Sequence, residues 1–319
     1  MAAAAAMLDE RYDNLSQHPS DQNNYILGRI GEHNVAMACL GSGVTGTNSA
    51  ATVAAQMLVT FESIRFGLMV GIGGGAPGGN TDIRLGDVIV SKPFDTHGGV
   101  VQYDFGKTIG ENQFKRTGTL NKPPLVLLTA IARLETEHLM GGNHLQQHIS
   151  EMLGKYPNMK PKYTYQGSEH DRLFKPGYDH QSDDDLCEKC DIRELVSRDE
   201  RTIPAIHYGL IASGNQVMRH GATRDRLRKE LGVLCFEMEA AGLMDNFPCL
   251  VIRGVCDYAD THKDKRWQEY AAATAAAYAK ELLGIIPTSQ VGNTPTATMT
   301  LKAGESILIS TPCPLHEFV

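Results

Sequence analysis

The chain of 319 residues contains 42% hydrophobic and 21% charged residues, and it carries a formal net charge of -7. This composition is typical of a soluble globular protein, and the negative charge argues against a surface that binds nucleic acid or an anionic membrane. No apolar run approaches the about 20 residues needed to span a bilayer, and the alanine-rich start lacks the basic region and long apolar core of a signal peptide.

The N-terminal region predicts a short helix followed by two strands and a glycine-rich turn. Residues 1–8 are rich in alanine, and residues 25–40 predict a strand, a turn at 31–34 and a second strand. Glycines recur in residues 41–47, just before a predicted helix of small residues at 48–58. A turn of this kind between a strand and a helix lets backbone N–H groups approach an anion or a sugar.

Two further buried strands are predicted at residues 66–72 and 85–91, separated by a glycine-rich segment at 73–79. The segment after them contains Tyr103 and Asp104, which either contact a substrate or belong to a solvated turn. Apolar residues near helical spacing then predict an amphipathic helix over residues 125–139.

Residues from about 141 to 205 are polar, charged and proline-containing, and they exceed the usual length of a connection inside a compact domain. Both an insertion with its own role and a poorly ordered segment fit this composition. A Cys-x-x-Cys pair near two histidines can hold zinc tetrahedrally, and the candidate ligands are Cys187, Cys190, His170 and His180. Only one such pair exists, and a flexible acidic loop around residues 183–185 is the alternative.

The C-terminal part predicts a strand at residues 207–213, a charged helix at 223–231 and a long alanine-rich helix at 263–283. From residue 287 the chain is rich in Thr, Ser, Gly and Pro, which predicts a flexible tail over 287–319.

The stretch 233–260 contains the most informative pattern. Its first apolar run ends at Glu237 and Glu239, and its second ends at Arg253 and, shortly after, Asp257. Buried parallel strands have this pattern, and ligands of open α/β sheets bind at the carboxyl edge. We therefore expect Glu239 and Asp257 to face one pocket. The elements together predict a single three-layer α/β/α domain over residues 1–286, around a mixed, mostly parallel twisted sheet.

Two segments, Phe236–Ala241 and Cys256–Asp260, resemble the signature segments of the nucleoside phosphorylase and nucleosidase superfamily, in the same order. That superfamily includes purine nucleoside phosphorylase and methylthioadenosine nucleosidase. The resemblance covers roughly residues 25–283, apart from much of the insertion, and is closest to the nucleosidase-like domains of fungal proteins.

The resemblance implies roles for individual residues. Asp257 would protonate or hydrogen-bond N7 of a purine, and Glu239 would accept hydrogen bonds from the ribose 2′ and 3′ hydroxyls. Met238 would pack against the sugar, whereas Glu237 has either a structural hydrogen bond or a ligand contact. The remaining residues that would line the pocket are Val44, Ile72, Gly73, Gly74, Val217 and Met218.

Two departures from the family pattern bear on the reaction. Phosphorylases place an Arg and a Ser around the strand at 66–72, where this chain has Met69 and Ile72. Losing these groups removes charge-assisted phosphate contacts, which favours water as the nucleophile unless Arg29 or Arg84 supplies the contact. The family's first strand, with a Glu that helps to activate water, also has no counterpart here. Either Glu10 or a later acid replaces it, or catalysis is impaired.

These observations predict a purine nucleosidase that hydrolyses the N-glycosidic bond of nucleosides, or of nucleotides such as AMP or ATP. A phosphate-dependent phosphorylase and a non-catalytic nucleoside-sensing domain are the alternatives. The reaction needs no metal or organic cofactor. We expect a homo-oligomer, and because the seven cysteines are odd in number and lie mostly in apolar runs, a reducing cytoplasmic location.

Overall fold

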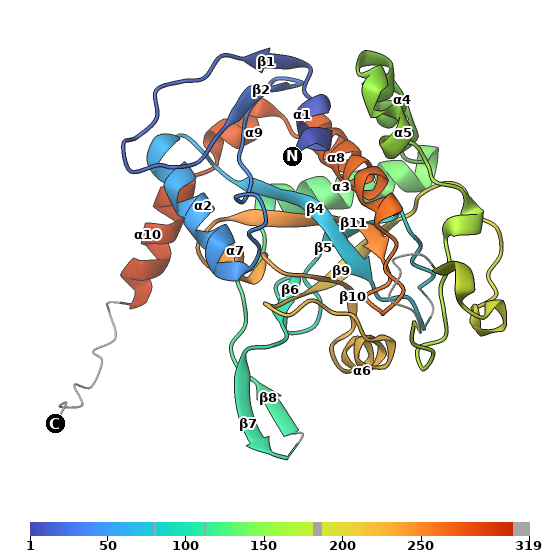
Figure 1. The fold of residues 1–319 in the computed structure, drawn as a ribbon. Helices are drawn as coiled ribbons and strands as arrows, with labels where there is room; N and C mark the ends of the chain where they lie inside the picture. Colours follow the sequence, from blue (N-terminus) through green and yellow to red (C-terminus); the bar gives the residue numbers. More distant parts are fainter. Residues whose placement is uncertain (80, 112, 181–186, 309–319) are drawn as a thin grey trace.

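The computed structural model describes residues 1–79, 81–111, 113–180 and 187–308. A central sheet of six strands is surrounded by helices, and a smaller sheet lies at one side (Figure 1). The central strands are β4 (Gly67–Gly75), β5 (Val88–Ser91), β6 (Val100–Gln102), β9 (Ile206–Ser213), β10 (Val233–Glu237) and β11 (Cys249–Asp257). The other strands are β1 (Glu10–Tyr12), β2 (Ile26–Ile30) and β3 (His33–Met37) of the smaller sheet, and β7 (Gly106–Gly110) and β8 (Gln113–Arg116) of a hairpin.

The α-helices are α1 (Ala2–Ala6), α2 (Thr47–Thr60), α3 (Leu125–Gly141), α4 (Leu145–Lys155), α5 (Lys160–Tyr163), α6 (Gly221–Leu231), α7 (Ala241–Met244), α8 (Gln268–Ile285), α9 (Thr288–Asn293) and α10 (Ala297–Leu308). Short 3-10 helices are η1 (Pro157–Met159), η2 (Ser168–His170), η3 (Cys187–Lys189), η4 (Ile192–Glu194) and η5 (Lys265–Trp267). No helix in the described ranges is long and apolar enough to cross a membrane.

The central sheet has the order β10-β4-β11-β5-β9-β6, and β10 also pairs with β9, so that the sheet closes on itself. Strands β4 and β11 are parallel, as are β9 and its partners β5, β6 and β10. The pairs β10–β4 and β11–β5 are antiparallel. The predicted α/β class with a mixed, mostly parallel sheet is therefore confirmed.

The direction of β10 differs from the sequence prediction. We expected β10 and β11 to end at the same edge, but β10 runs antiparallel to β4, to which β11 is parallel. The reason is the closure of the sheet, because β10 joins β4 on one side and lies parallel to β9 on the other. Along β4, Arg253 pairs with Gly71 and Asp257 with Gly74. These two positions are three residues apart, which is about 10 Å of strand.

Strand β11 and helix α8 form the centre of the core. Residues 249–256 of β11 are all buried, and α8 packs across β4 and β11. Alanines on α8 permit this close packing, and the long alanine-rich run predicted the helix correctly although it begins at Gln268. Helix α1 packs against α8 in turn through small buried side chains.

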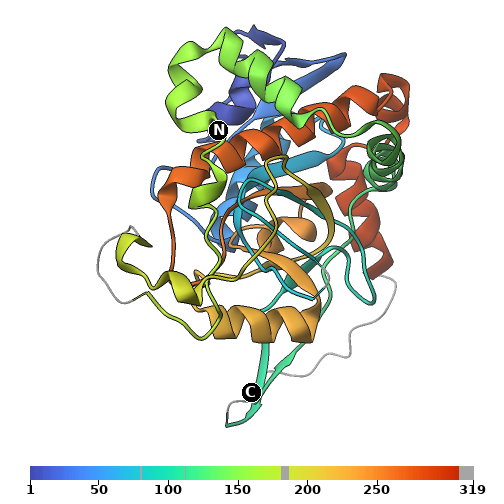
Figure 2. The same ribbon diagram turned by 90° about the vertical axis from the view of Figure 1, so that its right-hand side faces the viewer.

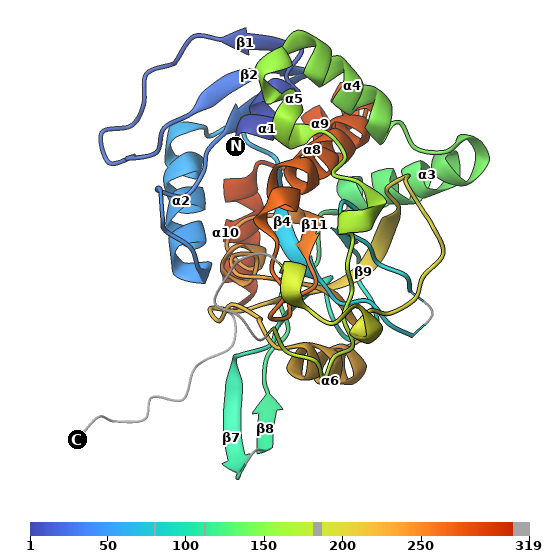
Figure 3. The ribbon, with the colours of Figure 1, turned by 45° about the vertical axis from the view of Figure 1, so that its right-hand side comes forward.

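The insertion is structured over its described residues. Helix α4 packs on α8, and the later segment passes the carboxyl ends of β4 and β11 (Figure 3). Its return to the core is fixed by buried Asp87, which accepts hydrogen bonds from Arg201 at 2.6 Å, His207 at 2.8 Å and the N–H of Ala205 at 2.9 Å. The insertion therefore packs as a layer over the domain.

Two other regions differ from expectation. We expected a flexible tail from residue 287, but α9 and α10 form there, Ala297 is fully buried, and its N–H donates to the carbonyl of Ile64 at 2.7 Å. Residues 309–319 lie outside the described part. The hairpin β7–β8 was not predicted, and it projects beyond the body of the molecule (Figures 1 and 2).

Candidate functional site

Glu237, at the end of β10, uses its carboxylate for internal bonds. It accepts hydrogen bonds from the backbone N–H groups of Glu239 at 3.1 Å and Ala240 at 3.0 Å, and it forms an ion pair with Arg253. Its side chain is 1% exposed. The sequence left two roles open for Glu237, a structural hydrogen bond and a contact with a ligand. These contacts agree with the structural role.

Arg253 links Glu237 to Glu239. Its Nη2 atom lies 3.3 Å from Oε2 of Glu239 as well as against Glu237. Burial by itself would lower the pKa of Arg253, but the two carboxylates raise it above its ordinary value. Gly71 makes room for the guanidinium, because a Cβ atom there would lie 2.0 Å from Nη1. Arg253 thus holds the Glu239 carboxylate, whose side chain remains 16% exposed.

Asp257 lies at the end of β11, where the chain turns sharply. Its Oδ1 accepts a hydrogen bond from the N–H of Ala259 at 2.8 Å, and its Oδ2 lies 3.1 Å from Nζ of Lys263. Ala259 has a φ of 53°, a conformation that costs free energy for a residue with a Cβ and that often occurs at functional sites. A side chain at Gly74 would clash with Asp257, since its Cβ atom would lie 2.7 Å from Oδ1.

Lys263 was not among the predicted site residues. The ion pair places a positively charged hydrogen-bond donor beside the Asp257 acceptor, so this pair offers a ligand both kinds of group. A lysine six positions after an aspartate carries no distinctive sequence signal. Only the turn through Ala259 brings the two side chains together.

Asp257 borders a cleft with an empty volume of about 560 Å³, including solvent at its mouth. The core and the insertion both contribute to the walls, which consist of Leu85, His170, Arg172, Cys187, Cys256, Asp257, Tyr258, His262, Asp264 and Arg266. Burial, with Asp257 beside it, raises the pKa of the Cys256 thiol well above its usual value. Cys256 is therefore a poorly reactive wall residue at neutral pH rather than a nucleophile.

Tyr258 ties the insertion to this end of β11. Its hydroxyl donates a hydrogen bond to Asp171, and Arg198 forms an ion pair with the same carboxylate at 3.2 Å. The guanidinium of Arg198 also lies 5.3 Å from the centre of the Tyr258 ring. Burial and the neighbouring Asp171 raise the pKa of Tyr258 well above its usual value. The insertion segment beside the cleft is therefore held in place by buried polar contacts.

A second polar group lies near the end of β10. Oδ1 of Asn215 accepts hydrogen bonds from the N–H of Thr47 at 3.1 Å and from its hydroxyl at 3.2 Å. The N–H of Asn215 donates to Oδ2 of Asp104 at 2.7 Å, while Oδ1 of Asp104 is buried without a hydrogen-bond partner among the described residues. Burial raises the pKa of Tyr103 to about 12, with contributions from Asp104 and Glu237. The glycine-rich loop before α2 and Asp104 thus meet near Glu237.

Other predicted residues lie in different settings. Gly73 and Gly74 are buried on β4 and Ile72 is half-buried beside them, whereas Val44 and Val217 are 47% and 55% exposed on loops. Met218 packs against a small core cluster, and Met238 is half-buried between the two glutamates. Of all predicted substrate-contacting residues, the walls of the cleft include Asp257 alone.

Three charged residues considered from the sequence are engaged elsewhere. Glu10 pairs with Arg29 at 3.3 Å on the smaller sheet, and Figure 1 places β1 away from the carboxyl ends of β4 and β11. Arg84 pairs with Asp82 at 2.8 Å. Of the alternatives left open for the family's water-activating Glu, Glu10 does not fit, because it lies on the smaller sheet, whereas a later acid and impaired catalysis stay open.

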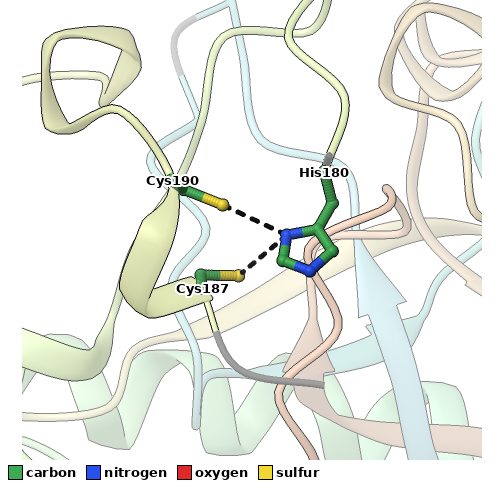
Figure 4. Close-up of side chains that lie close together, drawn as sticks. All are labelled: His180, Cys187 and Cys190. Atoms are coloured by element: carbon green, nitrogen blue, oxygen red, sulfur yellow. Dashed lines mark hydrogen bonds between the residues drawn. The ribbon is translucent and has the colours of Figure 1, made fainter. Parts of the chain in front are cut away.

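The zinc candidates separate into two groups. His180, Cys187 and Cys190 lie together, with their ligand atoms all within 4.8 Å of one another (Figure 4). Nδ1 of His180 is 3.1 Å from Sγ of Cys190 and 3.9 Å from Sγ of Cys187. His170 is not part of this group, and its Nε2 lies 3.6 Å from Glu169. The acidic residues 183–185, which were the alternative explanation, lie outside the described part.

Comparison with curated proteins gives one long alignment and two short ones. Over 289 residues the chain is 48% identical to a nucleotide-binding leucine-rich repeat (NLR)-like protein of Hyaloscypha variabilis, which covers 90% of this chain and 28% of that protein. Over 89 residues it is 34% identical to the 5′-methylthioadenosine/S-adenosylhomocysteine nucleosidase of Mycobacterium bovis, which covers 26% of this chain and 35% of that enzyme. The aligned residues thus make up a minor part of each relative.

Solved structures share the fold at low identity. A putative 5′-methylthioadenosine/S-adenosylhomocysteine nucleosidase of Borrelia burgdorferi bound to adenine matches with a TM-score of 0.57 and 17% identity, over 90% of this chain and 97% of that one. A mutant of the Helicobacter pylori nucleosidase with 5′-methylthioadenosine in the active site matches with a TM-score of 0.55 and 15% identity, over 88% and 92%. The sequence model of the phosphorylase superfamily matches residues 1–288. The chain therefore belongs to the phosphorylase superfamily.

Proposed function

We propose that this chain is a purine nucleosidase, which hydrolyses the N-glycosidic bond to release a free purine base and ribose, or ribose phosphate from a nucleotide. The observation that carries the proposal is the spacing along β4 between Arg253, which holds Glu239, and Asp257. In this arrangement Glu239 would be the carboxylate that binds the sugar and Asp257 the carboxylate that binds the base. The glycine-rich end of β4 lies between them.

At one end, Asp257 and Lys263 would act on the leaving base. Cleavage of the glycosidic bond builds up positive charge on the sugar and negative charge on the base, so a donor at N7 stabilises the transition state more than the ground state. Lys263, 3.1 Å from Asp257, supplies such a donor, and the carboxylate orients it.

At the other end, Glu239 would accept hydrogen bonds from the ribose hydroxyls. Its ion pair with Arg253 fixes the carboxylate before the substrate arrives, which lowers the entropic cost of positioning the sugar. Glu237 supports the arrangement from the interior, since it holds both the guanidinium and the N–H of Glu239.

Asp104 is the best-placed acid to activate water. Its Oδ1 is buried and unpartnered among the described residues, whereas its Oδ2 is fixed by Asn215. Asn215 also holds Thr47, at the end of the glycine-rich loop that the family uses beside the ribose and the nucleophile. An acceptor oxygen without a partner is what a general base needs to orient a water molecule.

Water is favoured over phosphate as the nucleophile because the cations considered for phosphate binding are already paired. Arg253 reaches the sulfur of Met69 at 3.5 Å, where the phosphorylases have an arginine, but it is neutralised by Glu237 and Glu239. Arg29 and Arg84 form ion pairs with Glu10 and Asp82. A phosphate group at this position would meet carboxylates instead of an unpaired guanidinium.

The test is the release of free base, followed by chromatography, from adenosine, inosine, methylthioadenosine, AMP and ATP with and without phosphate. We expect release without phosphate, and heavy oxygen from labelled water should appear in the sugar product. Asp104→Asn should lower kcat by about 10²-fold or more while the KM changes little. Strict dependence on phosphate would establish a phosphorylase instead.

A nucleoside-sensing domain is the second candidate. The 48% identity to an NLR-like protein over 90% of this chain favours it, because the aligned part is 28% of a larger protein. Thermal stabilisation by a nucleoside, with no base released from any of the five substrates, would support sensing over hydrolysis. Base release at any rate that Asp257→Asn abolishes would support the nucleosidase.

A further inference from the structure

Two cysteines and a histidine of the insertion lie together beside the cleft of Asp257. Cys187 begins η3 and Cys190 directly follows it, and the N–H of Cys190 faces the carbonyl of Cys187 at 3.4 Å. The ring of His180 points its Nδ1 toward both sulfur atoms (Figure 4). All three side chains are half-buried, and their ligand atoms lie within 4.8 Å of one another.

This donor set suits one kind of metal. Two thiolates and an imidazole are the ligands of structural zinc sites, and soft sulfur donors disfavour magnesium and calcium. In a tetrahedral site with Zn–S near 2.3 Å and Zn–N near 2.0 Å, neighbouring ligand atoms are roughly 3.5 to 4 Å apart. The distances from Nδ1 of His180 to the two sulfur atoms, 3.1 and 3.9 Å, are close to this value.

His262, on the core side, is the candidate for the fourth position. Its side chain is 2% exposed, and neither ring nitrogen has a hydrogen-bond partner among the described residues. The ring centres of His180 and His262 are 5.6 Å apart, and two imidazoles on one tetrahedral zinc ion have ring centres roughly 5 Å apart. The carboxylate of Asp260 lies 3.8 Å from Nδ1 of His262, which leaves Nε2 for a metal. His262 lies outside the group of three, so binding needs a change in its ring orientation.

Surrounding contacts hold the four residues near one another. The N–H of His180 donates to the hydroxyl of Thr261 at 2.8 Å, next to His262. The rings of Phe174 and Tyr178 stack with that of His262, and the hydroxyl of Tyr178 accepts from the N–H of Asp191, next to Cys190. These contacts bring the insertion and the end of β11 together, so that only the ring of His262 has to turn for all four residues to reach one metal ion.

We propose that His180, Cys187, Cys190 and His262 bind a structural zinc ion that fastens the insertion to the core beside the cleft that Asp257 borders. Cys187 itself borders that cleft with Arg172, whose Nη1 donates to the Cys187 carbonyl at 3.3 Å. The metal thus sets the position of the insertion wall that faces Asp257. This site is separate from the catalytic groups proposed above, and its chemistry does not depend on the reaction.

The test begins with the metal content of the full chain, purified without chelators and without an immobilised-metal step. We expect one zinc ion per chain by elemental mass spectrometry, and cobalt in its place should give the intense visible absorption of a tetrahedral thiolate site. Cys187→Ser and Cys190→Ser should each lose the metal. Cys39→Ser, at an exposed cysteine, and His170→Ala, at the neighbouring histidine outside the group, should both retain it.

His262→Phe tests the fourth ligand, because phenylalanine preserves the stacking on Phe174 and removes the nitrogen donors. Loss of a residue that only hydrogen-bonds a metal ligand weakens metal binding by about tenfold or more. Loss of a direct ligand should therefore weaken zinc binding by at least about tenfold. Unchanged affinity would overturn the assignment of His262.

A cysteine variant can fail to fold, so the wild-type protein provides a second measurement. A zinc-selective chelator should lower its melting temperature, and added zinc should restore it. Wild-type protein that remains metal-free after incubation with zinc, or that has a Cys187–Cys190 disulfide under reducing conditions, would overturn the site. Neither result depends on whether the chain hydrolyses a nucleoside.

Discussion

Glu237 and Asp257 end the two strands of one signature stretch, yet their surroundings are opposite. Glu237 is 1% exposed and is held by two backbone N–H groups and a buried arginine. Asp257 is 11% exposed, pairs with the partly exposed Lys263, and borders a cleft. A carboxylate with every acceptor site filled from inside supports a fold, whereas one beside a cleft can exchange a partner for a ligand.

The comparison also explains Glu239. It shares Arg253 with Glu237, but Arg253 retains one strong partner when Glu239 is altered. Glu239 can therefore lose its charge with little damage to folding, and Glu237 cannot. The substitutions below separate the structural acid Glu237 from Glu239 and Asp257, the two acids that we propose act on a substrate.

The largest effect is expected for Asp257→Asn. Turnover should fall by about 10²- to 10⁴-fold, the range for loss of general acid–base catalysis, because the donor Lys263 loses the carboxylate that orients it, while substrate binding and the melting temperature change little. Single-turnover base release and a thermal melt measure the two quantities. Asp95→Asn, on an exposed loop, is the matched control. An unchanged rate in the Asp257 variant would remove this residue from the mechanism.

Glu237→Gln should instead destabilise the protein by about 3–5 kcal/mol, because it leaves the buried Arg253 charge without its main partner. Urea unfolding followed by circular dichroism measures the loss. Glu137→Gln is the control, since the exposed ion pair of Glu137 with Arg133 should contribute less than about 1 kcal/mol. Equal stability losses in the two variants would contradict the structural role of Glu237.

Glu239→Gln should have an intermediate effect. A hydrogen bond to a charged group contributes about 1.5–3 kcal/mol, so kcat/KM should fall by roughly 10- to 100-fold, with unfolding close to wild type. The same substitution should matter less for a substrate analogue without the 2′ hydroxyl, because one of the two sugar contacts is already missing. Equal losses of kcat/KM for both substrates would show that Glu239 does not contact the ribose 2′ hydroxyl.

The smallest effect concerns the cysteines beside the two acids. Burial raises the pKa of Cys235, near Glu237, and that of Cys256, next to Asp257. Iodoacetamide should therefore label exposed Cys39 first, Cys256 at the cleft wall slowly, and Cys235 only on unfolding. Labelling of native Cys256 should accelerate as pH rises, because its thiolate fraction increases. Peptide mass spectrometry gives the order of labelling. Labelling of Cys235 before Cys256 would contradict the position of the cleft beside Cys256.

The sequence by itself determined the elements that depend on local pattern. Continuous apolar runs predicted β4, β9 and β11, small residues predicted α2 and α8, and the two signature segments identified Glu239 and Asp257 as candidates. These patterns predict structure because burial on both faces of a strand, or close packing of a helix, restricts the type of residue at each position.

Tertiary structure decided the contacts between residues that are far apart or carry no local signal. The pairing of β10 with both β4 and β9 reversed the expected direction of β10. It also brought the Glu237 carboxylate into an ion pair with Arg253. The turn at Ala259 brought Lys263 to Asp257, and the packed insertion brought His180 close to His262. Such pairings depend on strand register and on where the chain reverses. Both set distances between side chains that cannot be calculated from their spacing along the sequence.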